Sequence, residues 1–347
     1  MATIYDIADL AGVSAKTVSR VLNEDKAVKP VTRERVLEAA ARLDYRPNTQ
    51  ARQLRLGARS SIGLMLEDPS SGYQARFHHA MLTACMEADR YLTIELFDPQ
   101  LVAWEDYLDR FIVDAQISDM ILLPTLCDFG PLKSFLKSRN INCVLISPST
   151  PDSHYASVAM DDHLAARGVT EYLLQMGHSR IAHIGGHPDH AASLLRRNGF
   201  YEAFDVIGAP RPPQAYVEQG NFSFRSGIEA TTRLLSLPNR PTAIFACNDE
   251  MAAAACSVAH KMGIRIPEDL AIVGFDDAPI SSAVWPTLTT VRQPYLEMAR
   301  RCVQILKGAG DVLKPSDTQV RHIVPHEIIL RETTEPRLPG AIAGVAE

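Results

Sequence analysis

The sequence is poor in the features that mark secreted, membrane and metal-binding proteins. Its 347 residues contain 6 cysteines, which are widely scattered and form neither a Cys-x-x-Cys pair nor a Cys/His cluster. Buried thiols in a reducing cytoplasm are therefore expected, rather than disulfides or a zinc site. No apolar run is long enough to cross a bilayer, and the N-terminus lacks the pattern of a secretory signal. We expect a cytoplasmic protein without a membrane segment.

Recognisable catalytic patterns are also missing. Among the 11 histidines, His78 and His79 are adjacent, and His183, His187 and His190 are close along the chain. They do not have the His-Glu-x-x-His spacing of a zinc protease, and there is no Ser/His/Asp nucleophile elbow. The sequence thus predicts no catalytic residue, no metal and no cofactor, and an enzyme is kept only as an alternative.

Charge is unevenly distributed along the chain. A content of 46% hydrophobic and 22% charged residues is typical of globular domains, and the length suffices for two or three of them. Residues 1–60 carry 11 Lys+Arg against 7 Asp+Glu, a net charge of +4, while the remainder carries −10. This contrast is typical of a nucleic-acid-binding head on an acidic regulatory body, unless it is a chance fluctuation.

Residues 4–22 have the pattern of a helix-turn-helix. Thr3 can cap a first helix, Gly12 can take the left-handed conformation that ends it, and Ser14 can cap a second helix. In that second helix Val18 and Val21 can pack inward. The outward residues are short, polar or basic and can face a duplex: Ala15, Lys16, Thr17, Ser19 and Arg20. The alternative is a helical hairpin whose polar face meets only water.

A third helix and a linker follow this motif. After a turn at 29–32, a helix with Val36, Ala40 and Leu43 on one face closes a three-helix core. Residues 49–55 have helical potential around an exposed Leu54, but so short a helix is unstable alone. We expect it to order only with a partner chain and DNA. The predicted domains are a helix-turn-helix domain over 1–46 and a hinge helix over 47–58.

From residue 61 short apolar runs alternate with amphipathic helical stretches. Strand-like runs lie at 62–66, 92–97, 120–123, 143–146, 181–184, 243–246 and 270–273. Helical stretches lie at 77–89, 164–176, 195–206, 227–237 and 251–262. This alternation predicts parallel sheets with helices on both faces. The break near 148–151 indicates two doubly wound lobes, with the default ligand pocket in the cleft between them.

With these features the chain resembles the lactose-repressor (LacI/GalR) family of bacterial transcription regulators over residues 3 to about 331. In the head the resemblance depends on Gly12-Val13-Ser14-x-x-Thr17-Val18-Ser19-Arg20-Val21-Leu22-Asn23, and in the hinge on Tyr45-Arg46-Pro47-Asn48 with Ala51-Arg52-x-Leu54. In the core it depends on Gly177-His178-x-x-Ile181, Arg197-x-Gly199-Phe200, Asn248-Asp249, Val273-Gly274-Phe275-Asp276-Asp277 and Leu288-Thr289-Thr290-Val291.

The resemblance implies a small all-α helix-turn-helix head and a periplasmic-binding-protein-like α/β core of two doubly wound parallel-sheet lobes. It also implies a homodimer on double-stranded operator DNA and three crossings between the lobes. The effector-binding and dimerisation core then spans 59–333, with lobe 1 at about 59–159 and 288–318 and lobe 2 at about 160–287 and 319–331. The tail over 334–347 has no leucine heptad, which favours a dimer over a tetramer.

Roles for residues of the head follow from the same resemblance. The family's base-reading pair falls on Ala15 and Lys16, which would reach the edges of bases in the major groove. Leu54 matches the leucine that enters the minor groove and kinks the duplex. The full predicted DNA-binding set is Thr3, Ser14, Ala15, Lys16, Thr17, Ser19, Arg20, Asn23, Asn48, Arg52 and Leu54.

The resemblance also implies an effector site. Its residues would be Tyr73, Gln74, Asp161, Ser193, Arg197, Phe222, Asn248 and Asp276. Arg197 offers a planar fork of donors, carboxylates accept from hydroxyls, and Phe222 can cover a sugar ring. The purine-responsive branch has a second aromatic where Gln74 stands and an arginine where Ala191 stands, so a carbohydrate is favoured. A structural role for each residue remains the alternative.

The implied function is a repressor whose operator binding is relieved by a small carbohydrate bound between the lobes. A non-sugar effector or a co-repressor mode is the first alternative, and a sugar-binding protein without a regulatory role is a second. The identities of the operator and the effector, and the direction of the response, do not follow from the sequence.

Overall fold

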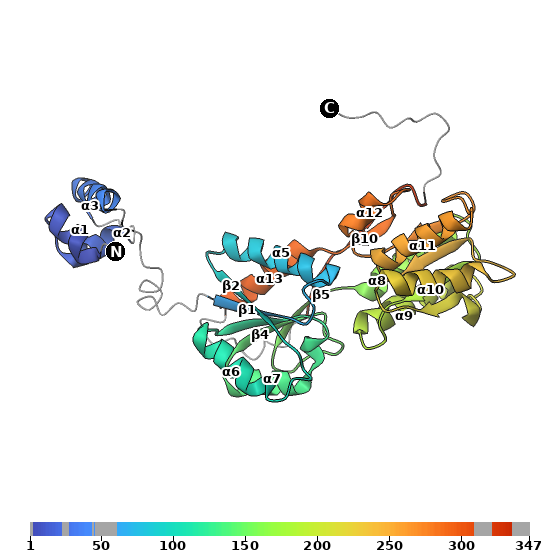
Figure 1. Ribbon diagram of the computed structural model, residues 1–347, viewed down its shortest axis with the longest axis horizontal. Coiled ribbons are helices and arrows are strands. Elements are labelled where there is room, and N and C mark those ends of the chain that lie inside the picture. The colour runs from blue at the N-terminus through green and yellow to red at the C-terminus, as the bar shows by residue number, and fades with distance from the viewer. Residues whose placement is uncertain (1–2, 23–27, 44, 46–60, 309–320, 335–347) are drawn as a thin grey trace, which may run out of the picture. The chain divides into compact units, whose positions relative to one another are not determined.

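The computed structural model describes residues 3–22, 28–43, 45, 61–308 and 321–334. The chain forms two compact units, Met1–Ser60 and Ser61–Glu347 (Figure 1). The hinge helix predicted over 47–58 lies outside the described residues, and so does the tail beyond Thr334.

The first unit contains the helix-turn-helix expected from the sequence. Its helices are α1 (Ile4–Ala11), α2 (Ala15–Leu22) and α3 (Pro30–Arg42). Thr3 and Asp6 form a reciprocal capping box at the start of α1, and Gly12 ends that helix with a φ of 62°. Ser14 Oγ accepts from the amide of Thr17 and caps α2. Side chains from all three helices, Ile7, Val18 and Val36 among them, are fully buried and form one core.

The first lobe of the second unit is a six-stranded parallel sheet. The spatial order is β11-β5-β4-β3-β1-β2. The strands are β1 (Ser61–Leu66), β2 (Tyr91–Leu96), β3 (Asp119–Leu122), β4 (Asn142–Ile146), β5 (Ala156–Met160) and β11 (Arg321–Val324). One face packs on α5 (Gly72–Glu87) and α13 (Tyr295–Gly308), and the other on α6 (Trp104–Asp114) and α7 (Gly130–Ser138). Because successive side chains of a strand point to opposite faces, the central strands β1, β3 and β4 contribute to both cores.

The second lobe repeats this plan with a smaller parallel sheet of order β7-β6-β8-β9. The strands are β6 (Ile181–Gly185), β7 (Val217–Gln219), β8 (Ala243–Ala246) and β9 (Ala271–Val273). The helices are α8 (Asp162–Gln175), α9 (Ala191–Ile207), α10 (Phe224–Leu235), α11 (Asp249–Lys261) and the short α12 (Pro279–Ala283). One apolar core lies beneath α10 and α11, and a separate one beneath α8 and α9.

Two of the three crossings lie farther along the chain than predicted. Leu288, expected in lobe 1, is buried in a core of lobe 2. The segment 319–331, expected in lobe 2, contains β11, which pairs with β5 at the edge of the lobe 1 sheet. The returning chain uses β10 (Thr290–Arg292) and β12 (Glu327–Ile329), which pair antiparallel at the crossing. Residues 321–324 alternate between exposed and half-buried, as an edge strand does, and this gave no apolar run to recognise.

Gly199 allows α8 and α9 to approach closely. A Cβ at this position would lie 2.1 Å from the carbonyl oxygen of His163 and 3.0 Å from the amide of Arg167, both on α8. Since these contacts are backbone atoms, the two helices would have to separate. We expect Gly199→Ala to lower the free energy of unfolding by about 1–3 kcal/mol, measured by urea denaturation.

A matched control is available in α7. A Cβ at Gly130 would meet no atom within 4 Å. Gly130→Ala should therefore change the free energy of unfolding by no more than about 0.5 kcal/mol. Equal stability of the two variants would contradict the close packing of α8 on α9.

Candidate functional site

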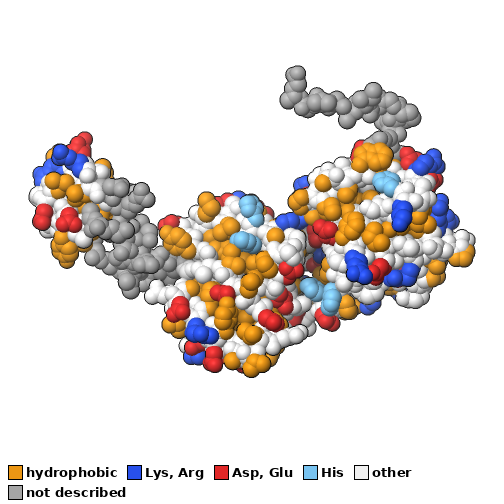
Figure 2. Space-filling model, in the orientation of Figure 1, with side chains coloured by type: hydrophobic (Ala, Val, Ile, Leu, Met, Phe, Trp, Pro, Cys, Tyr) orange, Lys and Arg blue, Asp and Glu red, His pale blue; other side chains and the backbone are white. Residues whose placement is uncertain are grey.

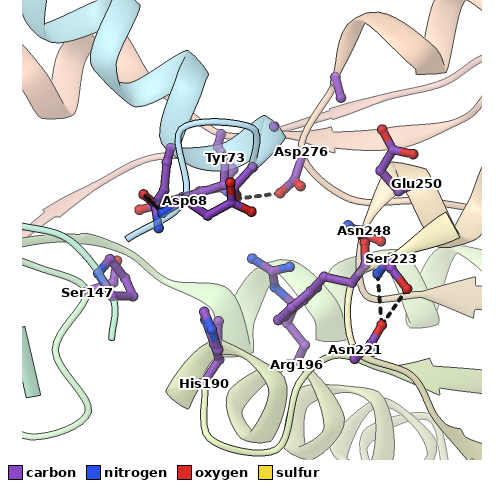
Figure 3. Close-up of a pocket in the computed structure, with 18 of the residues that line it drawn as sticks. Asp68, Tyr73, Ser147, His190, Arg196, Asn221, Ser223, Asn248, Glu250 and Asp276 are labelled. Atoms are coloured by element: carbon purple, nitrogen blue, oxygen red, sulfur yellow. Dashed lines mark hydrogen bonds between the residues drawn. The ribbon is translucent and has the colours of Figure 1, made fainter. Parts of the chain in front are cut away.

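A cavity of about 390 Å³ lies between the two lobes of the second unit (Figure 3). Lobe 1 contributes Asp68, Ser70, Ser71, Gly72, Tyr73, Gln74, Pro124 and Ser147. Lobe 2 and the crossing contribute Asp162, His190, Ala192, Arg196, Asn221, Phe222, Ser223, Phe224, Asn248, Glu250, Asp276, Ala278 and Gln293. Most of these residues follow strands or begin helices, the position at which doubly wound sheets bind ligands.

Arg196 is the central charged group of the cavity. Its side chain extends from α9, and only 4% of the residue is exposed. The Nε atom donates to Asp162 Oδ1 at 2.8 Å, Nη1 donates to the carbonyl of Cys247, and the guanidinium carbon lies 3.6 Å from the centre of the Phe275 ring. Burial alone would lower the pKa of Arg196, but the carboxylates of Asp162 and Asp276 outweigh burial and raise it. The guanidinium is therefore held charged and in one orientation.

Asp276 connects the two lobes at the side of the cavity. Its Oδ1 accepts from Gln293 Nε2 at 2.6 Å, and its backbone carbonyl accepts from Arg76 of α5. The guanidinium carbon of Arg76 lies 4.5 Å from the centre of the Tyr295 ring. Burial raises the pKa of Asp276, and the positive charges of Arg196 and Arg76 oppose that rise. One residue of lobe 2 is thus held by side chains from lobe 1 and from the crossing.

An aromatic wall faces this polar group. Phe222 has a left-handed φ of 68°, and its ring lies edge-on to His190 with 5.3 Å between the centroids. Asn248 Nδ2 donates to the Phe222 carbonyl at 2.8 Å, while its Oδ1 caps α11 by accepting from the amide of Met251. Gly186 is required behind the ring, because a Cβ there would lie 2.1 Å from Phe222 Cζ. The Phe222 ring is therefore held by the hydrogen bond to its backbone carbonyl and by the close packing of Gly186 behind it.

Five predicted effector residues line the cavity: Tyr73, Gln74, Phe222, Asn248 and Asp276. Gln74 faces it but also supports the adjoining loop, since its Oε1 accepts from the amides of Glu67 and Asp68. Ser193 does not line the cavity, and its Oγ donates to the carbonyl of His187 at 2.6 Å.

The predictions for Asp161 and Arg197 require correction by one position. Asp161 caps α8 by accepting from the amide of Leu164 at 2.9 Å, and Arg197 is exposed. Their neighbours Asp162 and Arg196 line the cavity instead. Successive residues of a helix point about 100° apart, so a shift of one residue changes the face of the helix.

A signal for Arg196 is present in the sequence. The buried residues of α9 are Ser193, Arg196, Gly199, Phe200, Ala203 and Phe204, which recur every three or four positions. An arginine within such a stripe must be buried, and a buried arginine needs a carboxylate partner or a ligand. The other cavity residues, among them Asp68, His190, Glu250 and Gln293, were missed because they occur in loops or helix starts without a periodic pattern.

Asp249 lies fully buried next to the cavity at the start of α11. Its Oδ1 is 2.6 Å from Thr290 Oγ1, and its Oδ2 accepts from the amide of Ala278 at 2.6 Å. Burial, with a further contribution from the nearby carboxylate of Asp276, raises the pKa of Asp249 to about 8. The carboxyl is therefore protonated at neutral pH in the folded protein but ionised in the unfolded chain.

This pKa predicts a loss of stability with rising pH. The contribution of Asp249 is fully present below its unfolded pKa near 4 and is lost progressively up to its folded pKa of about 8. Asp249→Asn keeps an amide that can donate to Thr290 and accept from Ala278, and it removes the titration. Urea denaturation should show the variant gaining stability relative to wild type as pH rises from 5 to 8. A difference independent of pH would contradict a protonated Asp249.

The second helix of the first unit presents the predicted DNA-contacting face. Lys16 and Arg20 are exposed, and Ala15, Thr17 and Ser19 are partly exposed. Val18 and Val21 are buried on the opposite side of α2. Thr3 and Ser14 cap the first two helices. The predicted contacts at Asn23, Asn48, Arg52 and Leu54 lie outside the described residues. No helix in the described part of the chain has the length and apolar character to cross a membrane.

Two protein-family descriptions match the chain. "Bacterial regulatory proteins, lacI family" matches residues 3–48, and "Periplasmic binding protein-like domain" matches residues 170–334. The first match covers the helix-turn-helix, and the second covers most of lobe 2 and the returning crossings. Helix-turn-helix and ligand-binding core are thus recognised independently.

Individual proteins agree with this division. The repressor PurR of Aliivibrio salmonicida is 29% identical over 306 residues, which cover 88% of this chain and 91% of that protein. Catabolite control protein A of Priestia megaterium is 31% identical over 96% of this chain and 99% of its own length. A solved structure of the lac repressor dimer bound to operator and the anti-inducer ONPF superposes with a TM-score of 0.79 at 25% identity, covering 96% of this chain and 99% of that one. These relatives are transcriptional regulators and not enzymes. The chain belongs to the LacI family of bacterial regulatory proteins and is a DNA-binding transcriptional repressor.

Proposed function

We propose that this repressor binds a small carbohydrate in the cavity between the lobes and that the bound sugar releases the operator. The observation that carries the proposal is the convergence of the Arg196 guanidinium, the Asp276 carboxylate and the Asn248 amide beside the Phe222 ring. The volume of about 390 Å³ is in the range of small-molecule sites.

The chemistry of these groups matches a polyhydroxylated ring. A sugar presents hydroxyls that both donate and accept, and a less polar ring face formed by C–H groups. Carboxylate oxygens accept from hydroxyls, guanidinium N–H groups donate to them, and an amide does both. The ring of Phe222 offers a flat apolar surface to the other face of the sugar. This division into polar edge and aromatic wall supports a sugar as the ligand.

Release of DNA would follow from differential affinity for two arrangements of the lobes. Tyr73 belongs to lobe 1 and Arg196 to lobe 2, so a sugar that contacts both binds more tightly when the lobes close. Lobe 1 begins at β1, directly after the predicted hinge over 47–58. Closure would then change the separation of the two hinges in a homodimer and withdraw Leu54 from the minor groove. Moving the equilibrium from mostly bound to mostly free requires roughly 5 kcal/mol of such bias.

The test of this function measures both sugar binding and operator binding. Thermal unfolding of the full chain is followed against a panel of mono- and disaccharides, and operator affinity is then measured with and without each stabilising sugar. The proposal expects at least one sugar to raise the melting temperature and to weaken operator binding. Tighter operator binding with that sugar would reverse the direction to co-repression. Stabilisation by no sugar would contradict a carbohydrate effector.

A purine is the second candidate ligand. The edge-on pair of His190 and Phe222 could also flank a planar base, and one relative is the repressor PurR. Adenine, guanine and hypoxanthine therefore belong in the same panel. If a purine raises the melting temperature of the protein and no sugar does, the effector is a purine.

We propose further that two copies of the chain bind a near-palindromic operator, with Ala15 and Lys16 at base edges and Thr17, Ser19 and Arg20 at phosphates. Lys16→Ala should then weaken operator binding by about 10-fold or more and lower the preference for operator over random DNA. Fluorescence anisotropy with both duplexes measures the two affinities, and a footprint tests for two half-sites.

The matched control is Lys261→Ala, which removes a lysine from the end of α11 in the other unit. It should leave both affinities unchanged. If Lys16→Ala weakens binding to operator and to random DNA equally, Lys16 contacts phosphate and does not read bases.

A further inference from the structure

Acidic side chains outnumber basic ones around the cavity. Among the described residues, four carboxyl groups line it, and Arg196 is the one arginine. The carboxyl groups are those of Asp68, Asp162, Glu250 and Asp276. Figure 2 shows acidic side chains on both sides of the groove between the lobes. This excess of acidic over basic side chains disfavours a ligand of negative charge.

The positive charge of Arg196 is already matched. Its Nη2 lies 2.8 Å from Asp162 Oδ1, and both side chains are about nineteen-twentieths buried, with 5% and 6% exposed. His190 adds no charge near pH 7, because burial lowers its pKa. Arg196 can still donate hydrogen bonds to a ligand, but the part of the lining that the structure describes offers no unpaired cation to a phosphate or carboxylate.

Two of the carboxylates have no cationic partner among the described residues. Glu250 is half-buried in the first turn of α11, and no hydrogen bond or ion pair of its carboxylate is formed within the described part of the chain. Asp68 is exposed and accepts from the hydroxyl and amide of Ser70, and these bonds lower its pKa. Figure 3 shows the two groups on opposite lobes, with the cavity between them. Both carboxylates line the cavity and can accept hydrogen bonds from a ligand.

We propose that the cavity selects sugars without a phosphate or carboxylate group, and that Glu250 and Asp68 are specificity-determining residues which reject anionic sugars. This inference deepens the proposed function and depends on it. Arg196 is already paired with Asp162, so no unpaired cation in the described lining offsets the repulsion between an anionic ligand and the acidic side chains. At an effective dielectric constant near 20, two like charges about 6 Å apart correspond to roughly a 100-fold loss of affinity.

Helix N-termini at the cavity favour anions, so anionic sugars test most directly whether the acidic side chains have the larger effect. The starts of α5 and α9 open onto the cavity without an acidic residue in their first turn, and helix N-termini attract anions. The starts of α8 and α11 carry Asp162, and Asp249 with Glu250, which oppose that attraction. The proposal states that the carboxylates outweigh the helix ends.

The first experiment is calorimetric titration of the full chain with matched sugars. The probes are D-glucose, D-galactose, D-xylose, maltose and cellobiose, together with the phosphorylated and uronic-acid derivatives of the two hexoses and of any other member that binds. Each anionic derivative should bind at least about 100-fold more weakly than its neutral parent. An anionic sugar that binds within about threefold of its parent, or that binds while its parent does not, overturns the inference and leaves the carbohydrate function standing. Binding of neither class overturns the proposed function as well.

The second experiment tests Glu250 and Asp68 directly. Glu250→Gln and Asp68→Asn each remove one charge with little change of shape, and each should narrow the ratio of neutral to anionic affinity by about 10-fold. Asp114→Asn is the matched control, because Asp114 is exposed at the end of α6 and does not line the cavity. Thermal unfolding checks that each variant is folded. Ratios equal to wild type in both cavity variants would remove these residues from the specificity mechanism.

Discussion

Arg196→Ala is expected to lower the free energy of unfolding by about 3–5 kcal/mol and to abolish effector binding. The substitution leaves the Asp162 carboxylate buried without its cation, and it removes the donor to the carbonyl of Cys247. It also removes the cation packed 3.6 Å from the Phe275 ring. Urea denaturation measures the first effect, and calorimetric titration with the sugar that stabilises wild type measures the second.

The neighbouring arginine provides a matched control. Arg197 lies on the exposed side of α9, and Arg197→Ala should change stability by no more than about 0.5 kcal/mol and leave effector binding intact. Arg196→Lys keeps the charge but not the planar fork, so it should recover part of the stability and little of the binding. If Arg197→Ala lost effector binding and Arg196→Ala did not, Arg197 would be the effector-binding arginine, as the family resemblance implied.

The fold of the head follows from short-range chemistry, which explains why the sequence was sufficient for it. Thr3 caps α1 three residues before Asp6, and Gly12 takes the left-handed conformation directly after the helix. Ser14 caps α2 through the amide of Thr17. Each of these interactions joins residues that are close along the chain, so the residue types and their spacing determine them.

The fold class of the two lobes could be predicted from the sequence, but some of their strands could not. The apolar strands β1, β3, β4 and β8 are fully or almost fully buried and stand out in the sequence. The strands β10, β11 and β12 are short and partly exposed, and they depend on pairing with distant segments. Arg321 pairs with Ser157, for example, across more than half the core. Such pairing is set by tertiary contacts and not by local pattern.

Prediction of the site residues from the sequence was limited in the same way. Asp276 could be placed because it lies in the characteristic segment Val273-Gly274-Phe275-Asp276-Asp277, and Phe222 was placed by the family resemblance. Glu250 could not, because its role depends on the absence of a partner, and this becomes visible only when α11 and the loops around it are assembled. Resemblance identified the right region of α9 but the wrong residue, since one position in a helix separates Arg196 inside from Arg197 outside.

Asp276 has more connections than a simple ligand residue requires. Arg76 from α5 binds its carbonyl, and Gln293 binds its carboxylate from the crossing segment that continues into α13. Both helices lie on one face of the lobe 1 sheet (Figure 1). A sugar hydroxyl that donated to the Asp276 carboxylate would either displace the hydrogen bond from Gln293 or bind the same carboxylate beside it. Asp276 thus joins the cavity by direct hydrogen bonds to α5 and to the segment that leads into α13.

Asp276→Ala is accordingly expected to yield a repressor that binds its operator but no longer responds to the sugar. Loss of the carboxylate removes an acceptor for the ligand and leaves Gln293 without its partner, which together should weaken sugar binding by about 10- to 100-fold. Asp276→Asn keeps an acceptor for Gln293 but not the charge, so it should retain a weaker response at higher sugar concentration. Operator affinity is measured by fluorescence anisotropy across a sugar titration for wild type and both variants. A wild-type response in Asp276→Ala would exclude the carboxylate from the switch, and loss of operator binding without sugar would show that Asp276 supports the DNA-binding arrangement instead.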